Sequence, residues 1–171
     1  MAKTDIQQIA HLMRRAGFGA TREQLDQYAE IGYDATVEML LNTSSPNAMS
    51  EYLVRRYHPD EASLMYGRGG GEAALYRMVT TDAPLLEKMA IFWHGIFATG
   101  YSKVGHSKAL NDQIRMFKKY SMGNLRDLLV QMAKAPAMII WLDNQQNHKT
   151  SINENFGREL LELFSMGVGN Y

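Results

Sequence analysis

The sequence contains no cysteine in its 171 residues. This absence excludes disulfide bonds, thiolate zinc sites and a cysteine nucleophile. The sequence also lacks an excess of charge of either sign, because 18 Lys and Arg residues balance 18 Asp and Glu residues. A balanced charge provides no long-range attraction to phosphate backbones or anionic lipids, so a nucleic-acid partner is not indicated.

Long hydrophobic runs are absent as well. The longest apolar run, "MAIFWHGIFA" at 89–98, is far shorter than the roughly 20 residues that a membrane-spanning helix needs. The first residues, "MAKTDIQQIA", do not form the apolar core of a signal peptide. From these residues alone we expect a soluble protein without a membrane span, located in the cytoplasm.

Strand patterns are also missing, whereas helical periodicity runs through most of the chain. We expect an all-α fold, a compact bundle of roughly eight short to medium helices within a single domain over 1–171. The glycine run at 67–71 is a candidate internal hinge. The first five predicted helices run from Thr4 or Asp5 to about Arg15, from Thr21 to Gly32, from Tyr33 to Leu41, from about Ala48 to the His58-Pro59-Asp60 tripeptide, and through "EAALYRMVTT" after Gly71. The others run from Leu85 to about Thr99, from about Ser107 to Tyr120, through "LRDLLVQMAKA" after its cap Asn124, through "PAMIIWL" from Pro136, and from a Ser151/Glu154 capping box to Gly167.

The segment 85–99 is the most apolar predicted helix. On a helical wheel His94 lies opposite an arc that contains Trp93 and Ile96, and both faces of the helix are largely apolar. We therefore expect this helix to be buried all round, with His94 desolvated and in need of a partner. Two interpretations of His94 are open: a histidine satisfied within the core, or a metal ligand or general base. The predicted apolar arc contains Leu85, Met89, Phe92, Trp93 and Ile96.

The last predicted helix has two different faces. Glu154, Arg158 and Glu162 follow one another at intervals of four residues on its polar face, with Asn155 and Glu159 beside them. This face is either a solvated surface with salt bridges or part of a site that further polypeptide completes. The opposite, core-facing stripe contains Ile152, Phe156, Leu160, Leu163 and Phe164.

The loop before this helix is rich in oxygen-bearing side chains. Asp143, Asn147, Ser151 and Glu154 have a spacing similar to that of an EF-hand calcium loop, but His148 occupies the position at which the sharp turn requires glycine. A hard-cation site built from some of these oxygens is one interpretation. The other is that the asparagine and aspartate side chains build the turn and cap the helix. The candidate metal ligands are Asp143, Asn147, Asn153 and Glu154.

Four stretches together resemble a known bacterial family, "domain of unknown function 1800", of which this chain is similar to the N-terminal portion. They are "HLMRRAGFGAT" at 11–21, "EKMAIFWHGIFAT" at 87–99, "PAMIIWLDNQQN" at 136–147 and "NENFGRELLELFSMGVGNY" at 153–171. The resemblance covers essentially the whole chain, and the last stretch is its most specific part.

The resemblance implies a larger protein. Members of the family are typically much longer and continue beyond the position of Tyr171 with further helices, so we expect this fold to be incomplete at its C-terminus. Many relatives carry export signals and are encoded beside a sulfatase-like partner, which implies a periplasmic or secreted setting. Many also have a second histidine two positions after the one that matches His94. Ile96 stands there in this chain, so a His-x-His metal pair is absent.

Two functional hypotheses follow, and neither defines a reaction. The first is a helical scaffold or interaction module whose partner is the remainder of a longer polypeptide. The alternative is a hydrolase-like or metal-dependent enzyme, with a divalent metal as its cofactor and a polar site on the last helix. The catalytic candidates of this alternative are His94, Glu154, Arg158 and Glu159.

Overall fold

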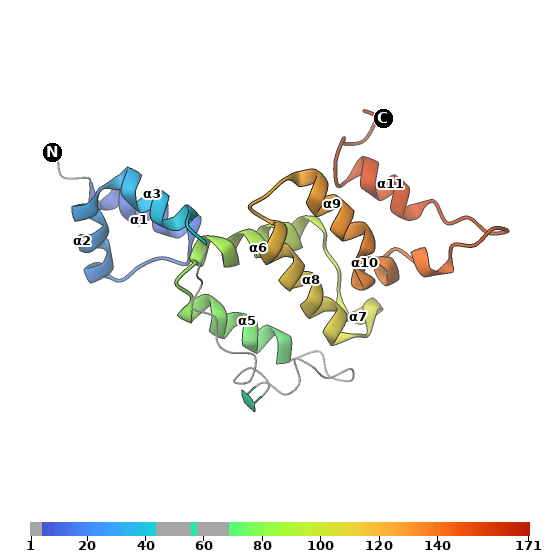
Figure 1. Cartoon of the computed structure of the whole chain (residues 1–171), viewed down its shortest axis with the longest axis horizontal. Coiled ribbons are helices and arrows are strands. Elements are labelled where there is room, and N and C mark those ends of the chain that lie inside the picture. The colour runs from blue at the N-terminus through green and yellow to red at the C-terminus, as the bar shows by residue number, and fades with distance from the viewer. Residues whose placement is uncertain (1–4, 44–55, 58–68) are drawn as a thin grey trace. The chain divides into compact units, whose positions relative to one another are not determined.

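The described part of the chain is built from α-helices. The computed structural model describes residues 5–43, 56–57 and 69–171 (Figure 1). Within these ranges there is no named strand and eight helices have seven residues or more, which confirms the predicted all-α class. None of the described helices is long and apolar enough to cross a membrane. The described residues divide into two compact units, one with residues 5–43 and Ala74–Lys88 and one with residues 56–57, 69–73 and Met89–Tyr171.

The first unit packs three consecutive helices around a small core. Ile9 and Met13 of one helix and Leu40 of another form this core and are almost completely buried, with Leu25 and Tyr28 packed against them. The unit contains α1 (Ile6–Ala16), α2 (Arg22–Ile31), α3 (Tyr33–Leu41), most of α5 (Gly69–Thr80) and the first residues of α6 (Pro84–Ile96).

The helix starts in this unit follow from local sequence signals. Asp5 caps α1 by accepting a hydrogen bond from the Gln7 N–H at 2.9 Å. The predicted capping box at α2 is confirmed, because Thr21 Oγ1 accepts from the Gln24 N–H while Gln24 Oε1 accepts from the Thr21 N–H. Gly32 separates α2 from α3 with a φ of 97°, a left-handed conformation that favours glycine.

Part of the predicted organisation lies outside the described residues. This applies to most of the helix predicted from Ala48 to the His58-Pro59-Asp60 tripeptide, although residues 56–57 are helical. Of the candidate hinge at 67–71, residues 69–71 form the first turn of α5 instead of a loop. The hinge itself stays a prediction.

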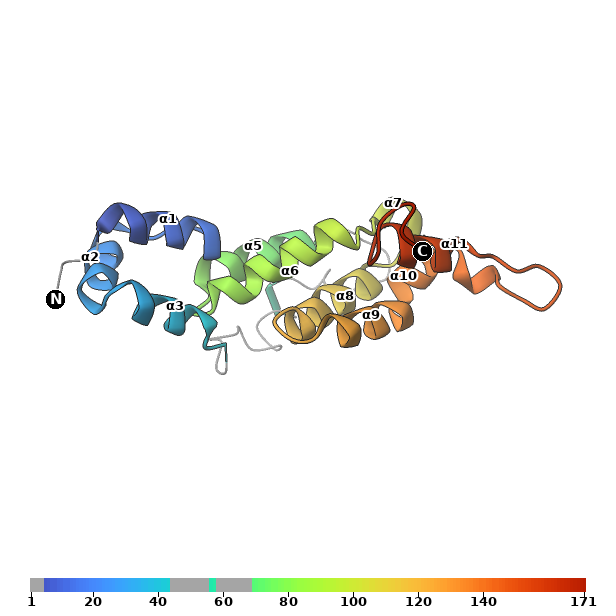
Figure 2. The ribbon, with the colours of Figure 1, turned by 90° about the horizontal axis from the view of Figure 1, so that it is seen from above.

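The second unit contains the main hydrophobic core. Phe97, Phe117, Leu128, Met132 and Met138 are at its centre, each no more than 1 % exposed. Figure 2 shows α8 and α9 side by side, with α10 at their end. The remaining helices of the unit are α7 (Tyr101–Val104), α8 (Ser107–Tyr120), α9 (Leu125–Lys134), α10 (Pro136–Trp141), the short 3-10 helix η2 (Asn144–Gln146) and α11 (Asn155–Glu162).

Helix α6 corrects two predictions. It ends at Ile96, three residues before the predicted end at Thr99, and it is not buried all round. Phe92 is 53 % exposed and Ile96 is 37 % exposed, whereas Ala90 and Phe97 are buried. Periodicity identifies apolar faces of a helix, but neighbouring elements decide which of them is covered.

An aromatic cluster joins the end of α6 to α8 and to the C-terminal segment. The ring of Phe97 stacks on Trp93 at 5.5 Å and on Phe117 at 6.0 Å between centroids. Phe164 meets it edge-on at 4.9 Å. A buried amide supports this cluster, because Gln113 Nε2 donates to the Phe97 carbonyl and Gln113 Oε1 accepts from the Thr99 hydroxyl. These bonds satisfy polar groups at the end of α6 that would otherwise be buried without partners.

Candidate functional site

The polar residues before α11 are organised around one asparagine. Asn153 Nδ2 donates to the carbonyls of Leu142 and Asp143 at 3.3 and 3.0 Å. Asn153 Oδ1 accepts a hydrogen bond at 3.0 Å from the N–H of Asn155, which is the first residue of α11. A single side chain therefore connects the end of α10 to the start of α11.

A second asparagine closes the same loop. Asn147 Oδ1 accepts from the Asn153 N–H at 3.3 Å, and Asn147 Nδ2 donates to the Asn153 carbonyl, also at 3.3 Å. Beyond this pair His148 and Ser151 form an isolated antiparallel bridge. In Figures 1 and 2 this part of the chain extends away from the helices of the second unit as a narrow loop. The asparagines thus build the turn, as one of the two sequence interpretations expects.

The predicted Ser151/Glu154 capping box is wrong. Helix α11 begins at Asn155, and its N-cap residue Glu154 makes no side-chain capping bond. The reason is that Asn153 already caps the Asn155 N–H, while the Ser151 backbone is paired with His148. At the other end regular helix stops at Glu162, and irregular turns continue to Gly167, whose φ of 86° is left-handed.

The Asp143 carboxylate is held by a residue that sequence reasoning missed. Lys103 Nζ donates to Asp143 Oδ2 at 2.7 Å and to the Trp141 carbonyl at 2.6 Å. Asp143 also has a φ of 56°, a left-handed conformation that aspartate tolerates better than most residues. No local signal in the sequence could have identified Lys103, because it lies 40 residues before Asp143.

Among the described residues, Arg158 forms no ion pair with Glu154 or Glu162, although the three are spaced at intervals of four. Arg158 Nη2 instead donates to Asn155 Oδ1 at 2.8 Å and lies 3.7 Å from the Glu159 carboxylate. Glu162 accepts a hydrogen bond from the Tyr171 hydroxyl. This bond raises the pKa of the tyrosine, because the carboxylate stabilises the protonated phenol.

A pocket of about 530 Å³ lies beside the start of α11. Its charged side chains are Glu154 and Arg158, and Phe156 and Tyr171 supply apolar surface. Glu154 is exposed, and its carboxylate forms no hydrogen bond or ion pair with the residues that the structure describes. The pocket thus contains a carboxylate and a guanidinium, and this carboxylate has no partner among the described residues. Its remaining lining residues are Asn144, Asn147, Asn153 and Gly157.

His94 lies elsewhere in the second unit. Its ring is 6.2 Å from that of Phe117 between centroids, and its buried Nδ1 atom has no hydrogen-bond partner among the described residues. Burial lowers the pKa of His94 from 6.5, because the charged imidazolium loses its hydration. No described residue therefore satisfies Nδ1, whereas a fully satisfied core histidine would have a partner there.

The structure brings some of the predicted site residues together and leaves others apart. Asn147, Asn153, Glu154 and Arg158 line one pocket, whereas His94 is not among its lining residues. The Glu159 carboxylate lies near the Arg158 guanidinium, and the Asp143 carboxylate forms an ion pair with Lys103. Within residues 5–43, 56–57 and 69–171, no three His, Asp or Glu side chains form a group that could hold a metal ion. The catalytic and metal assignments stay predictions.

The lowered pKa of His94 makes a pH-dependent stability testable. Because its folded-state pKa is below 6.5, the unfolded chain binds more protons in acid. The free energy of unfolding should be highest above pH 6.5 and should fall as the pH drops below it, by up to about 1.4 kcal/mol per pH unit. Urea unfolding at several pH values, followed by the fluorescence of Trp93 and Trp141, measures this dependence in the second unit.

The matched variants are His94→Gln and His148→Gln. His94→Gln should flatten the decline between pH 7 and pH 5. The exposed His148 serves as the control, and its substitution should leave the decline unchanged. An identical pH dependence in the wild type and His94→Gln would show that His94 is not responsible.

Fold and site together describe an all-α protein whose last helix, α11, is held to the preceding helix by an asparagine-built turn. Comparison with protein families matches residues 11–171 to "Protein of unknown function (DUF1800)". The chain belongs to this family, as the four motifs indicated. No curated protein and no solved structure matches the chain.

Proposed function

We propose that the chain is a helical scaffold or interaction module and that its C-terminal segment, from Ile152 to Tyr171, is a contact surface for further polypeptide. The observation that carries this proposal is the exposed apolar surface of that segment. Phe156 and Phe164 pack against the main core, and apolar side chains beside them are exposed. The exposed fractions are 79 % for Ile152, 63 % for Leu163, 50 % for Met166, 74 % for Val168 and 57 % for Tyr171.

The polar contacts of this segment support the same proposal. Single exposed apolar residues are normal on protein surfaces, but a group of them in one segment is typical of an interaction site. Asn153 and Asp143 use their side chains to fix the turn in place, so the segment is displayed in a defined conformation. The partner that we propose is the remainder of a longer polypeptide, which the family resemblance implies.

Leu163→Asp tests the proposal when it is made in two contexts, residues 1–171 alone and the complete natural polypeptide. In the 171-residue chain Leu163 is 63 % exposed, so the stability should change by only about 0.5 kcal/mol. In a longer polypeptide that covers Leu163, the same substitution would bury an unpaired charge and should cost about 2 kcal/mol or more. Urea unfolding measures both changes.

Gln145→Asp is the control, since it introduces the same charge at an exposed position of η2. It should have little effect in either context. Equally small effects of Leu163→Asp in both contexts would contradict the proposal. A natural polypeptide with no residue after Tyr171 would contradict it as well.

A hydrolase-like or metal-dependent enzyme is the second candidate. The pocket beside α11, with its free Glu154 carboxylate and the Arg158 guanidinium, is the observation that favours it. A glutamate could act there as a base or a metal ligand, and an arginine could hold an anionic group. The same unfolding measurements, repeated with EDTA and then with calcium, manganese or zinc, separate the candidates. Stabilisation by one metal that Glu154→Gln removes would favour the enzyme.

A further inference from the structure

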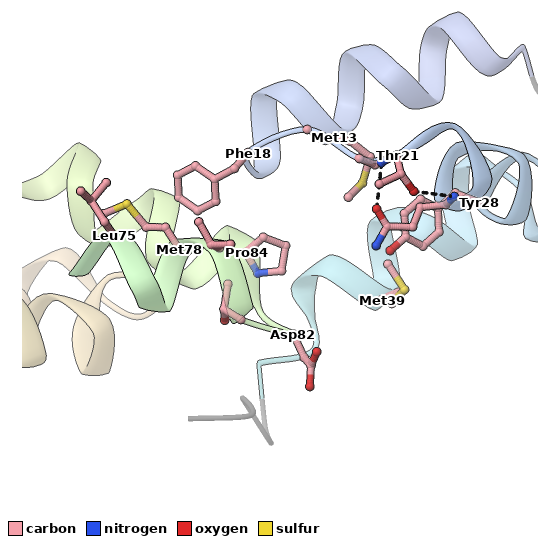
Figure 3. Close-up of a pocket in the computed structure, with 14 residues that line it drawn as sticks. Met13, Phe18, Thr21, Tyr28, Met39, Leu75, Met78, Asp82 and Pro84 are labelled. Carbon is pink, nitrogen blue, oxygen red and sulfur yellow. Dashed lines mark hydrogen bonds between the residues drawn. The ribbon is translucent and has the colours of Figure 1, made fainter. Parts of the chain in front are cut away.

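The first unit contains a pocket of about 900 Å³, distinct from the polar pocket beside α11. All of its lining residues belong to this unit. Figure 3 shows Phe18, Leu75 and Met78 on one side, Met13, Tyr28 and Met39 on the other, and Pro84 between them. Its size is at the upper end of the range for small-molecule sites, which is roughly 300–1,000 Å³.

The lining of the pocket is mainly aliphatic and thioether. Three methionines line it, namely Met13, Met39 and Met78. Methionine side chains are flexible and polarisable, so they adapt to ligands of irregular shape. Leu75 is 64 % exposed and Val79 is 85 % exposed, which leaves this apolar surface open to solvent. Such a surface suits an alkyl chain.

Most polar groups of the pocket are already used by the protein. Thr21 and Gln24 bind each other's backbone in the capping box, shown by the dashed lines in Figure 3. Thr81 Oγ1 accepts a hydrogen bond from the Ala83 N–H at 3.0 Å. These groups contribute surface to the pocket, but their bonds to the backbone leave few of them to select a polar ligand.

Asp82 differs from these groups, and among the described residues that line the pocket it is the charged one. It is exposed, and its carboxylate has no hydrogen bond or ion pair within the described part of the chain. The nearby cation Lys88 is engaged elsewhere, since its ammonium lies over the Phe18 ring at 5.2 Å and donates to the Arg14 carbonyl. The pocket thus combines an apolar interior with one carboxylate that forms no ion pair with the described residues.

We propose that this pocket binds a cationic amphiphile, with its alkyl chain among the three methionines and its ammonium head beside Asp82. Burial of each methylene group should tighten binding by about fourfold until the apolar surface is filled. The carboxylate should favour a cationic head over an anionic one by roughly two- to fivefold, because an exposed ion pair contributes little. The charge of Asp82 therefore selects the head group of the ligand, and the alkyl chain of the ligand supplies most of the affinity.

Octyltrimethylammonium is the probe, titrated into the 171-residue chain with methyl-labelled methionines and followed by NMR. The methyl signals of Met13, Met39 and Met78 should shift in a saturable manner, while those of Met132 and Met138 in the second unit should not. The probe should bind more tightly than octyl sulfate, which has the same chain and the opposite charge. Hexyltrimethylammonium should bind more weakly than the octyl compound by about tenfold or more.

Asp82→Asn removes the charge with little change of shape and should abolish the preference for the cationic head. Asp34→Asn is the matched control, since Asp34 is an exposed aspartate of the same unit that does not line the pocket. This variant should keep the preference. Three results would each overturn the proposal: no saturable shift of the three methionines, equal binding of octyl sulfate, or an unchanged preference in Asp82→Asn.

Discussion

Phe97→Ala is expected to destabilise the second unit by about 3–5 kcal/mol, the cost of removing a fully buried phenylalanine ring. Phe97 is 0 % exposed and contacts the rings of Trp93, Phe117 and Phe164. The substitution would leave a cavity, and three rings from different parts of the unit would lose their contact with Phe97. Because a domain is stable by only about 5–15 kcal/mol in total, most of the unit's stability is at risk. Urea unfolding followed by tryptophan fluorescence measures the loss.

Phe92→Ala is the matched control, with the same substitution five residues earlier in the chain, within α6. Phe92 is 53 % exposed and contacts Trp93 edge-on at 5.1 Å. Its removal should cost about 1 kcal/mol, since an exposed ring leaves no closed cavity. Equal costs for the two variants would mean that Phe97 is not at the centre of the core.

Asn153→Ala is expected to loosen the attachment of α11 by about 1–3 kcal/mol. The substitution would remove the bonds of the side chain to the Leu142 carbonyl, the Asp143 carbonyl and the Asn155 N–H. The loss of this capping bond and of the link to α10 should destabilise mainly α11 and the loop before it. Amide hydrogen exchange within Arg158–Glu162 should accelerate by about tenfold or more, while exchange in α8 and α9 should change less.

Two further asparagine variants make this test specific. Asn153→Asp keeps the oxygen that caps Asn155 but loses the Nδ2 donor, so its effect should be intermediate. Asn144→Ala removes only the contact of Asn144 Oδ1 with Asn147 Nδ2 at 3.4 Å and should have little effect. If Asn153→Ala and Asn144→Ala behave alike, Asn153 is not the residue that holds the turn.

Sequence patterns predicted the helices well where the signals are local. The Thr21/Gln24 capping box is recovered because its two partners are only three residues apart, and α6 begins at Pro84, one residue before the predicted start at Leu85. The Ser151/Glu154 box has the same pattern but fails, since the backbone of Ser151 pairs with His148 and Asn153 takes the capping position. A capping motif predicts a helix start only when no stronger neighbouring contact competes for the same groups.

The candidate site was predictable in composition but not in arrangement. The sequence placed Asn147, Asn153, Glu154 and Arg158 near one another, because they lie within twelve residues, and the structure finds them around one pocket. Lys103 and Tyr171 were missed as partners, since Lys103 meets Asp143 across 40 residues of chain and Tyr171 reaches back to Glu162. The sequence left open whether His94 has a partner, and its Nδ1 atom has none within the part of the chain that the structure describes.

By itself, the sequence determined that this protein is helical, where most of its helices begin, and which family it belongs to. These properties depend on periodicity, on capping residues and on motifs, all of which act over short distances along the chain. Only the tertiary structure decided that Phe97 is buried while Phe92 is exposed, and that the asparagines hold a turn. It also decided that an apolar pocket lined by the Asp82 carboxylate lies in the first unit. These features depend on contacts between different elements, several of them far apart in the chain, which the pattern of a single helix does not contain.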